Sequence, residues 1–126
     1  MSGIWRLLFI AFLLAHAGIH AAIWATPAPK DPKAPFDAGQ SWLLGDQRAL
    51  ALALALLAAG LLLAAGIGLW THAEWWRPTA VVGLAVSLGL MVVYFNPWFL
   101  FIQAVNAALI VGILWLDWPS TSMVGA

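Results

Sequence analysis

The chain has few charged residues and no cysteine, and each scarcity excludes a class of protein. Of its 126 residues only 8% are charged, whereas 64% are hydrophobic, and the mean hydropathy is +0.96. A soluble domain of this size needs a charged and polar shell, which this composition does not provide. The absence of cysteine excludes disulfides, thiol redox chemistry and iron–sulfur ligation. With a net charge of zero and scattered basic residues, no nucleic-acid partner is expected.

The chain contains long apolar runs. Four of them are long enough to cross about 30 Å of hydrocarbon as helices, and they cover residues 4–24, 47–70, 78–95 and 98–116. Because each span crosses the membrane, successive helices must alternate in direction. We therefore predict an all-α fold, an integral membrane antiparallel four-helix bundle in a single domain. The alternative for the first run is a signal peptide cleaved after Ala17, which the continuation of the run to Trp24 disfavours.

The nine tryptophans support these spans, because all of them fall near span ends, as an interfacial aromatic belt requires. Trp24, Trp42 and Trp98 mark the end that carries the long loop, and the other six mark the end that carries both termini. The basic residues divide two to three between these ends, so the positive-inside rule leaves the orientation open. We expect a multi-pass protein of the bacterial plasma membrane with both termini in the cytoplasm.

Residues 26–46 form the longest predicted connection. Its prolines favour extended, polyproline-like backbone: Pro27, Pro29, Pro32 and Pro35. The apolar residues that follow predict a short segment on the membrane surface: Phe36, Trp42, Leu43 and Leu44. Asp46 has the chemistry of an N-cap for the second span. Two further predictions are a capping box made by Thr71 and Glu74 and a frayed chain end after Pro119.

Small residues recur every four positions on two of the predicted spans. The stripe on the second span consists of Gly60, Ala64 and Gly68, and the stripe on the fourth consists of Ala104, Ala108 and Gly112. Such a stripe lets a neighbouring backbone approach closely, and packing of this kind drives helix association in lipid. We therefore predict that both stripes are helix-packing surfaces.

Polar side chains within the spans are few, and at membrane depth each one raises a functional hypothesis. His16 and His20 share one face of the first span, since four residues turn a helix by about 400°. Further polar groups lie in the loop-side half of the third and fourth spans: Tyr94, Asn96, Gln103 and Asn106. At a rise of about 1.5 Å per residue these groups reach comparable depths. The antiparallel arrangement therefore predicts that all six converge in one polar pocket.

The two histidines carry no complete metal or catalytic motif. Their spacing resembles half of a zinc-protease site, but Ala17 stands where that motif needs its general base, and His72 belongs to the opposite end. Ser87 lacks the glycine pattern of a nucleophile elbow and has no aligned histidine. We expect no metal, no cofactor and no catalytic residue. We expect neutral histidines that hydrogen-bond across the bundle. Two alternatives stay open: a pocket that binds a quinone or a lipid headgroup, and ligation of zinc, copper or haem by a histidine.

The order of these features resembles a known family. The first span ends in Ala-His-x-x-x-His-Ala, a polar loop follows, and three spans come next, with Asn96-Pro97-Trp98 before the last. This order is similar to that of the small four-helix DoxX-like membrane proteins. It is also similar to uncharacterised actinobacterial membrane proteins of this size. The resemblance implies a membrane partner of redox enzymes, although the lack of cysteine argues against a thiol-linked role.

For function, the lack of a catalytic constellation and the two small-residue stripes predict a non-enzymatic accessory or stabilising subunit of a larger membrane complex. Its expected partners are other integral membrane subunits and membrane lipid. We expect a transport complex rather than a respiratory one, because no cofactor ligand set is visible, and lipid uptake would suit the actinobacterial style of the chain. The alternative is a DoxX-like redox-associated protein whose quinone or lipid pocket is lined by His16, His20, Asn96, Gln103 and Asn106.

Overall fold

The computed structural model describes residues 2–31, 33 and 37–125, and it is mostly helical. Its long helices are α1 (Ser2–Ala25), α2 (Arg48–Trp70), α3 (Trp76–Val93) and α4 (Leu100–Trp115), and the 3₁₀ helix η1 (Pro97–Phe99) leads directly into α4. Each of these four helices, α4 together with η1, is long and apolar enough to cross a membrane. Three residues named in the predicted loop lie outside the described residues: Pro32, Pro35 and Phe36.

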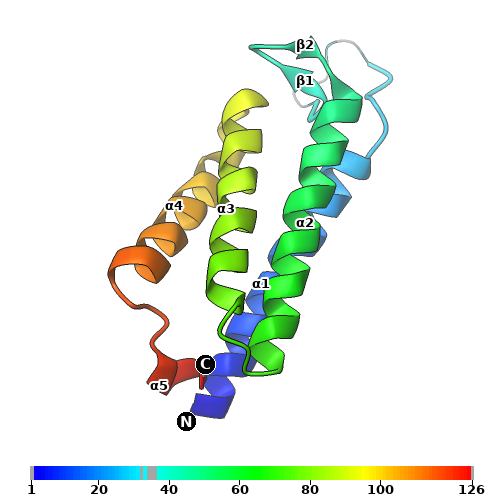
Figure 1. The fold of residues 1–126 in the computed structure, drawn as a ribbon. Coiled ribbons are helices and arrows are strands. Elements are labelled where there is room, and N and C mark those ends of the chain that lie inside the picture. The colour runs from blue at the N-terminus through cyan, green and yellow to red at the C-terminus, as the bar shows by residue number, and fades with distance from the viewer. Residues whose placement is uncertain (1, 32, 34–36, 126) are drawn as a thin grey trace.

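Helices that follow one another in the chain pack against one another, α1 on α2, α2 on α3 and α3 on α4. Neighbouring helices run in opposite directions, and both chain ends lie at one end of the molecule, opposite the loop between α1 and α2 (Figure 1). Fully buried aliphatic side chains fill the core between the first three helices, among them Leu13, Leu62 and Leu84. Because α4 packs closely on α3 but not on α1, it extends the arrangement to one side.

The side chain of Thr71, the C-cap residue of α2, closes the turn between α2 and α3. α2 is an almost uninterrupted run of alanine and leucine, which have high helix propensity. Thr71 Oγ1 then donates to carbonyl oxygens in the last turn of α2, at 3.1 Å. The predicted capping box is therefore wrong, because Thr71 caps α2 and the N-cap of α3 is Trp75. Pro78 falls in the first turn of α3, where its missing N–H has no intrahelical acceptor to lose.

The loop between α1 and α2 contains a small hairpin. Strands β1 (Gln40–Ser41) and β2 (Gly45–Asp46) pair antiparallel. Ser41 Oγ accepts hydrogen bonds from two N–H groups of the turn and donates to the carbonyl of Val93 at the end of α3, over 2.5 Å. The prediction that Asp46 caps α2 is wrong, because Asp46 belongs to β2 and the next residue takes the N-cap position without a side-chain bond.

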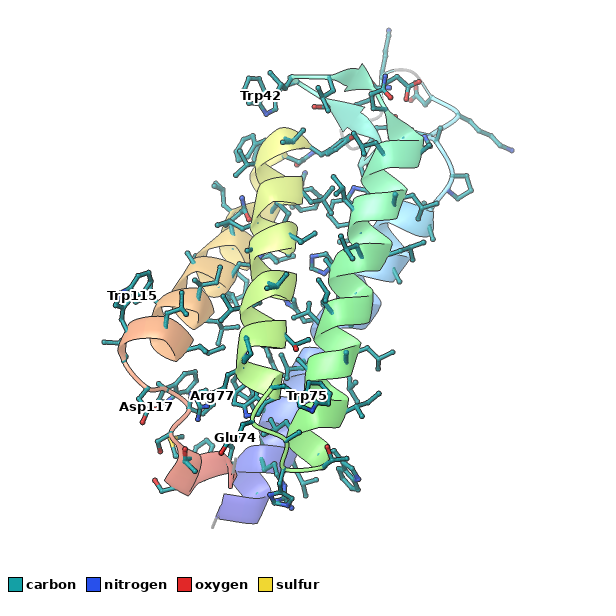
Figure 2. All side chains as sticks on the ribbon, in the orientation of Figure 1. Trp42, Glu74, Trp75, Arg77, Trp115 and Asp117 are labelled. Atoms are coloured by element: carbon teal, nitrogen blue, oxygen red, sulfur yellow. The ribbon has the colours of Figure 1, made fainter. Side chains whose placement is uncertain are left out.

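The segment after α4 folds back toward the N-terminus. Asp117 has a left-handed φ of 48°, and Arg77 Nη2 donates to the carbonyl of Pro119 over 2.7 Å. Figure 2 shows Arg77 and Asp117 at this corner, where their charged groups are 3.8 Å apart. Helix α5 (Thr121–Val124) then packs on α1 and buries Val124. The prediction of a frayed end is wrong for the described residues up to 125, because this short helix supplies an apolar side chain to the core.

Candidate functional site

Four polar side chains from three helices form one hydrogen-bonded cluster. His16 Nε2 lies 2.9 Å from Asn106 Oδ1, and Asn106 Nδ2 lies 2.8 Å from Ser87 Oγ. Ser87 Oγ lies 2.6 Å from His20 Nε2, and His20 Nδ1 lies 2.8 Å from the carbonyl oxygen of His16. His20, Ser87 and Asn106 are fully buried, and His16 is 5% exposed. The cluster therefore links α1, α3 and α4 in the interior.

The direction of each hydrogen bond follows from the groups that can only accept. The carbonyl of His16 only accepts, so His20 carries its proton on Nδ1, and its Nε2 accepts from the Ser87 hydroxyl. The Ser87 oxygen accepts from the Asn106 amide nitrogen, and the Asn106 oxygen accepts from the protonated Nε2 of His16. All four bonds are thereby made with both histidines neutral, which avoids burying an unpaired charge.

The same face of α1 carries a ladder of aromatic rings on both sides of the cluster. Phe12, His16, His20 and Trp24 recur every fourth residue, and consecutive ring centroids are 5.5, 4.9 and 5.6 Å apart. Trp24 Nε1 donates to the carbonyl of Ala38 in the loop, which anchors the loop-side end of the ladder. The two imidazole rings are therefore oriented by packing as well as by hydrogen bonds.

Three of the six predicted pocket residues meet in the cluster: His16, His20 and Asn106. The other three make separate hydrogen bonds. Tyr94 Oη donates to the carbonyl of Gln47 over 2.8 Å, at the start of α2. Asn96 Oδ1 accepts from the N–H of Trp98 over 3.0 Å and thereby caps η1. Gln103 bonds to the backbone of α3 on the outer side of the molecule.

Ser87 joins the cluster although its sequence context gives it no role. The prediction that no histidine is aligned with it is wrong, because His20 Nε2 comes within 2.6 Å of its hydroxyl. Its depth is the signal that locates it: Ser87 stands six residues before the end of α3, and His20 stands five before the end of α1, at the same end of the molecule. Serine paired with histidine is used in nucleophilic catalysis. Here the hydroxyl is fully buried and already engaged by Asn106, so the pair joins helices.

An apolar cavity lies beside the cluster. Its volume is about 250 Å³, and it is a partly open pocket between α1, α4 and the C-terminal segment, with Phe12, Leu109 and Trp118 in its walls. None of the four cluster residues lines it, but the ring of Phe12 stacks on that of His16. Among the described residues no group of three or more histidine or acidic side chains could hold a metal ion. His72 lies at the opposite end, where its ring hydrogen-bonds to Arg6.

The two small-residue stripes are divided between the interior and the surface. At Gly68 a Cβ atom would lie 2.8 Å from the ring of Trp75, and at Gly112 it would lie 3.3 Å from the carbonyl of Trp118. Ala64 is half-buried. The exposed members of the stripes are Gly60, Ala104 and Ala108. These three do not contribute to packing inside the chain, because the inner faces of α2 and α4 lie at other positions around each helix.

Comparison of the chain with known protein families, with curated proteins and with solved structures finds no match.

Proposed function

We propose that this chain is an antiparallel four-helix integral membrane protein of the bacterial plasma membrane and acts as a non-enzymatic accessory subunit of a larger membrane complex. The four apolar helical segments, of 18 to 23 residues, match the length needed to cross the hydrocarbon core. A transport complex, for example one for lipid uptake, is the assembly that we favour over a respiratory one. Among the described residues, no group of three or more histidine or acidic side chains could hold a metal ion.

The observation that carries this proposal is the outward position of small residues on two helices. Gly60 on α2 is exposed, and a Cβ atom added there would meet no atom within 4 Å. Ala104 and Ala108 on α4 are exposed as well. Lipid tails are as apolar as leucine, so helices associate in a membrane through close packing and hydrogen bonds, and small residues permit the close packing. These faces are therefore available to the helices of another subunit.

The buried cluster favours a structural role over a ligand site. Its four side chains satisfy one another, and they are at most 5% exposed. Hydrogen bonds between transmembrane helices stabilise their association by about 0.6–2 kcal/mol each. A ligand would have to break these bonds to reach His20 or the Nε2 of His16, whereas a subunit that must keep its shape among apolar helices benefits from them.

Purification from the native membrane tests the proposal. The tagged chain is extracted in a mild detergent, purified in one step and analysed by mass spectrometry, with an unrelated tagged four-helix membrane protein as the control. We expect stoichiometric recovery of a defined transport complex with the chain and not with the control. Reproducible recovery of the chain alone, in several mild detergents, would falsify the proposal.

A second candidate is a redox-associated protein of the DoxX-like kind that binds a quinone or lipid tail, and the cavity between α1 and α4 is the observation that favours it. Apolar cavities of about 150 Å³ stay dry and bind small apolar molecules, and this one is larger, at about 250 Å³. Val105→Trp would fill the cavity from α4 and should reduce the quinone or lipid that co-purifies. Val111→Trp, on the exposed side of α4, should leave the amount unchanged.

Replacing both histidines by leucine separates the two candidates. In an accessory subunit, the His16→Leu, His20→Leu variant should be less stable yet still recover the partner complex. In a quinone-binding protein, the same variant should bind less quinone while its helices remain folded, because Phe12 in the wall of the cavity stacks on the ring of His16. Helix content by circular dichroism, partner recovery and extracted quinone are measured on the same preparation, so that unfolding is not mistaken for loss of a ligand.

A further inference from the structure

The tip of the hairpin between α1 and α2 is an exposed apolar surface. Trp42, Leu43 and Leu44 are consecutive, and they are 68%, 58% and 44% exposed. Glycine, proline, asparagine, aspartate and serine dominate turns, whereas here no charged residue lies between Gln40 and Gly45. Contiguous exposed apolar residues mark a surface that contacts another protein or a membrane.

The base of the hairpin is tied to two helices, so the tip is presented in a defined place. Arg48 at the start of α2 forms an ion pair with Asp37 over 2.5 Å, and Asp37 also accepts from the N–H of Gly39 over 3.0 Å. Trp24 of α1 donates to the carbonyl of Ala38 over 3.0 Å. From this base the hairpin reaches across the end of α3 (Figure 1).

Two hydrogen bonds fix the depth of the tip. Ser41 Oγ donates to the carbonyl of Val93 over 2.5 Å. Trp42 Nε1 donates to the carbonyl of Val92 over 2.7 Å. Both carbonyls belong to the last turn of α3, which has no intrahelical N–H left to bond them. Helix α3 has 18 residues and is therefore roughly 27 Å long, close to the thickness of the hydrocarbon core. Its end, and the tip bonded to it, reach the boundary between hydrocarbon and headgroups.

The ring of Trp42 continues the outer surface of α3 and α4. Its N–H is already bonded to Val92, so the exposed part of the ring offers apolar surface. The ring shares one face of the molecule with Phe95 and Leu100, which are exposed as well. Figure 2 shows Trp42 beyond the end of α3. In a membrane-spanning chain this outer surface meets lipid, so lipid reaches the tip without a further protein.

We propose that residues 42–44 are inserted in the headgroup region of the lipid leaflet on the loop side, and that they anchor the loop and the end of α3 there. The proposal rests on the proposed function only in requiring that the chain span a membrane. Tryptophan is enriched at this depth because its ring is amphipathic. Leu43 and Leu44 beside it then contact the outermost part of the acyl chains.

Single cysteines with a nitrobenzoxadiazole label provide the test, because the chain has no cysteine of its own. Leu43→Cys places the label at the tip, Lys30→Cys is the matched control elsewhere in the same loop, and Leu57→Cys lies on the exposed side of α2. Each protein is placed in nanodiscs of phosphatidylcholine and phosphatidylglycerol. Fluorescence is quenched with aqueous iodide, or with lipid that carries a doxyl group near the headgroup or near the chain end.

We expect iodide to quench the label at the tip several-fold less than the label at Lys30. Doxyl lipid should quench the tip more strongly when the doxyl group lies near the headgroup than when it lies near the chain end. In native membranes, a benzophenone on the same tip cysteine should cross-link lipid, and a protein cross-linked there in high yield would overturn lipid as the occupant.

A charge at the tip tests whether its apolar side chains hold it in the leaflet. In the Leu43→Cys protein, Leu44→Asp should raise iodide quenching several-fold, because a carboxylate is costly to remove from water. Ala28→Asp adds the same charge at an exposed position elsewhere in the loop and should leave the quenching unchanged. Circular dichroism establishes that both variants fold. Equal quenching in the two variants would overturn the anchor.

The remaining outcomes separate this proposal from the proposed function. Equal iodide access at the tip and at Lys30, with the α2 label quenched by the deep doxyl lipid, would overturn the anchor and leave the spanning helices standing. Protection of the tip from both iodide and doxyl lipid would mean that a second copy of the chain covers it, and would also overturn the anchor. Recovery of the chain alone from native membranes would overturn the accessory role and leave the anchor standing.

Discussion

Asn106 and Gln103 stand three residues apart on α4, and their side-chain amides differ in how completely they are hydrogen-bonded. Asn106 is fully buried, and both ends of its amide are hydrogen-bonded, to His16 at 2.9 Å and to Ser87 at 2.8 Å. Gln103 uses only its nitrogen, in a long bond of 3.4 Å to backbone, and its oxygen has no partner among the described residues. The inner side of α4 is therefore complete within the chain, whereas its outer side is not.

The difference shows what holds this arrangement of helices together. α4 packs closely on α3 but not on α1, so the bond from Asn106 to His16 ties α4 to the first helix. In lipid, the hydrophobic effect does not favour one helix pairing over another, so satisfied polar groups select which helices meet.

Two glycines of α2, one on its packed side and one on its open side, should show the largest difference in the free energy of unfolding when they are replaced. At Gly68 a Cβ atom would already lie 2.8 Å from the ring of Trp75 and 3.0 Å from Cβ of Trp76, so Gly68→Leu should lower the free energy of unfolding by about 3 kcal/mol. Gly60→Leu, where nothing lies within 4 Å, should leave it unchanged or raise it by about 0.5–1 kcal/mol through better helix propensity. Thermal unfolding in detergent, followed by circular dichroism, measures both.

An equal loss in the two glycine variants would contradict the division of α2 into a packed and an open side. Gly60→Leu should instead act on the assembly, by lowering recovery of the partner complex, if that stretch of α2 contacts the other subunit.

Asn106→Leu should have the next largest effect. The substitution leaves the Nε2–H of His16 without an acceptor and removes the donor to Ser87, and a buried polar group left unpaired costs about 1–3 kcal/mol. We expect a loss of about 2 kcal/mol in the free energy of unfolding, measured in the same detergent. A neutral result would mean that His16 finds another acceptor, and that the cluster does not hold α4 against α1.

A double-mutant cycle on His20 and Ser87 tests the bond between α1 and α3. His20→Phe and Ser87→Ala should give a coupling energy of about 1 kcal/mol when they are measured alone and together. Each single substitution removes the 2.6 Å hydrogen bond, so the second substitution has no bond left to remove. Thr79→Ala combined with His20→Phe is the control, since the Thr79 hydroxyl donates to the carbonyl of Trp75 at the start of its own helix and the two effects should add. A coupling energy of zero for His20 and Ser87 would show that this hydrogen bond does not contribute to stability.

Much of this architecture could be predicted from run lengths and depth. The apolar runs predict helices over 4–24 and 47–70, and the structure has α1 at Ser2–Ala25 and α2 at Arg48–Trp70. Counting residues from the helix ends brings His16, His20 and Asn106 to similar depths, and antiparallel neighbours then bring them together. The same count places Ser87 beside them, although its surrounding sequence suggested only an incomplete catalytic motif.

Rotation around the helix axis could not be predicted in the same way. Asn96 and Gln103 are as polar as Asn106, but Asn96 falls at a helix end and caps η1, and Gln103 points to the outer side. The stripe of Ala104 and Ala108 likewise proved to be exposed. An almost uniformly apolar helix carries little hydrophobic contrast around its circumference. Which face turns inward is decided by contacts with other helices, and the pattern along one helix does not contain them.

The smallest expected effect belongs to Gln103 and decides whether the comparison with Asn106 holds. In the isolated chain, Gln103→Met should leave the free energy of unfolding unchanged or raise it by up to about 1 kcal/mol, because it removes an unpaired buried oxygen and only one long hydrogen bond. Asn106→Leu, measured in parallel, provides the reference for an amide that is fully bonded. A loss similar to that of Asn106→Leu would show that the Gln103 oxygen is satisfied within the chain. An unchanged free energy of unfolding would show that the Gln103 amide, unlike that of Asn106, contributes little to holding α4 in place.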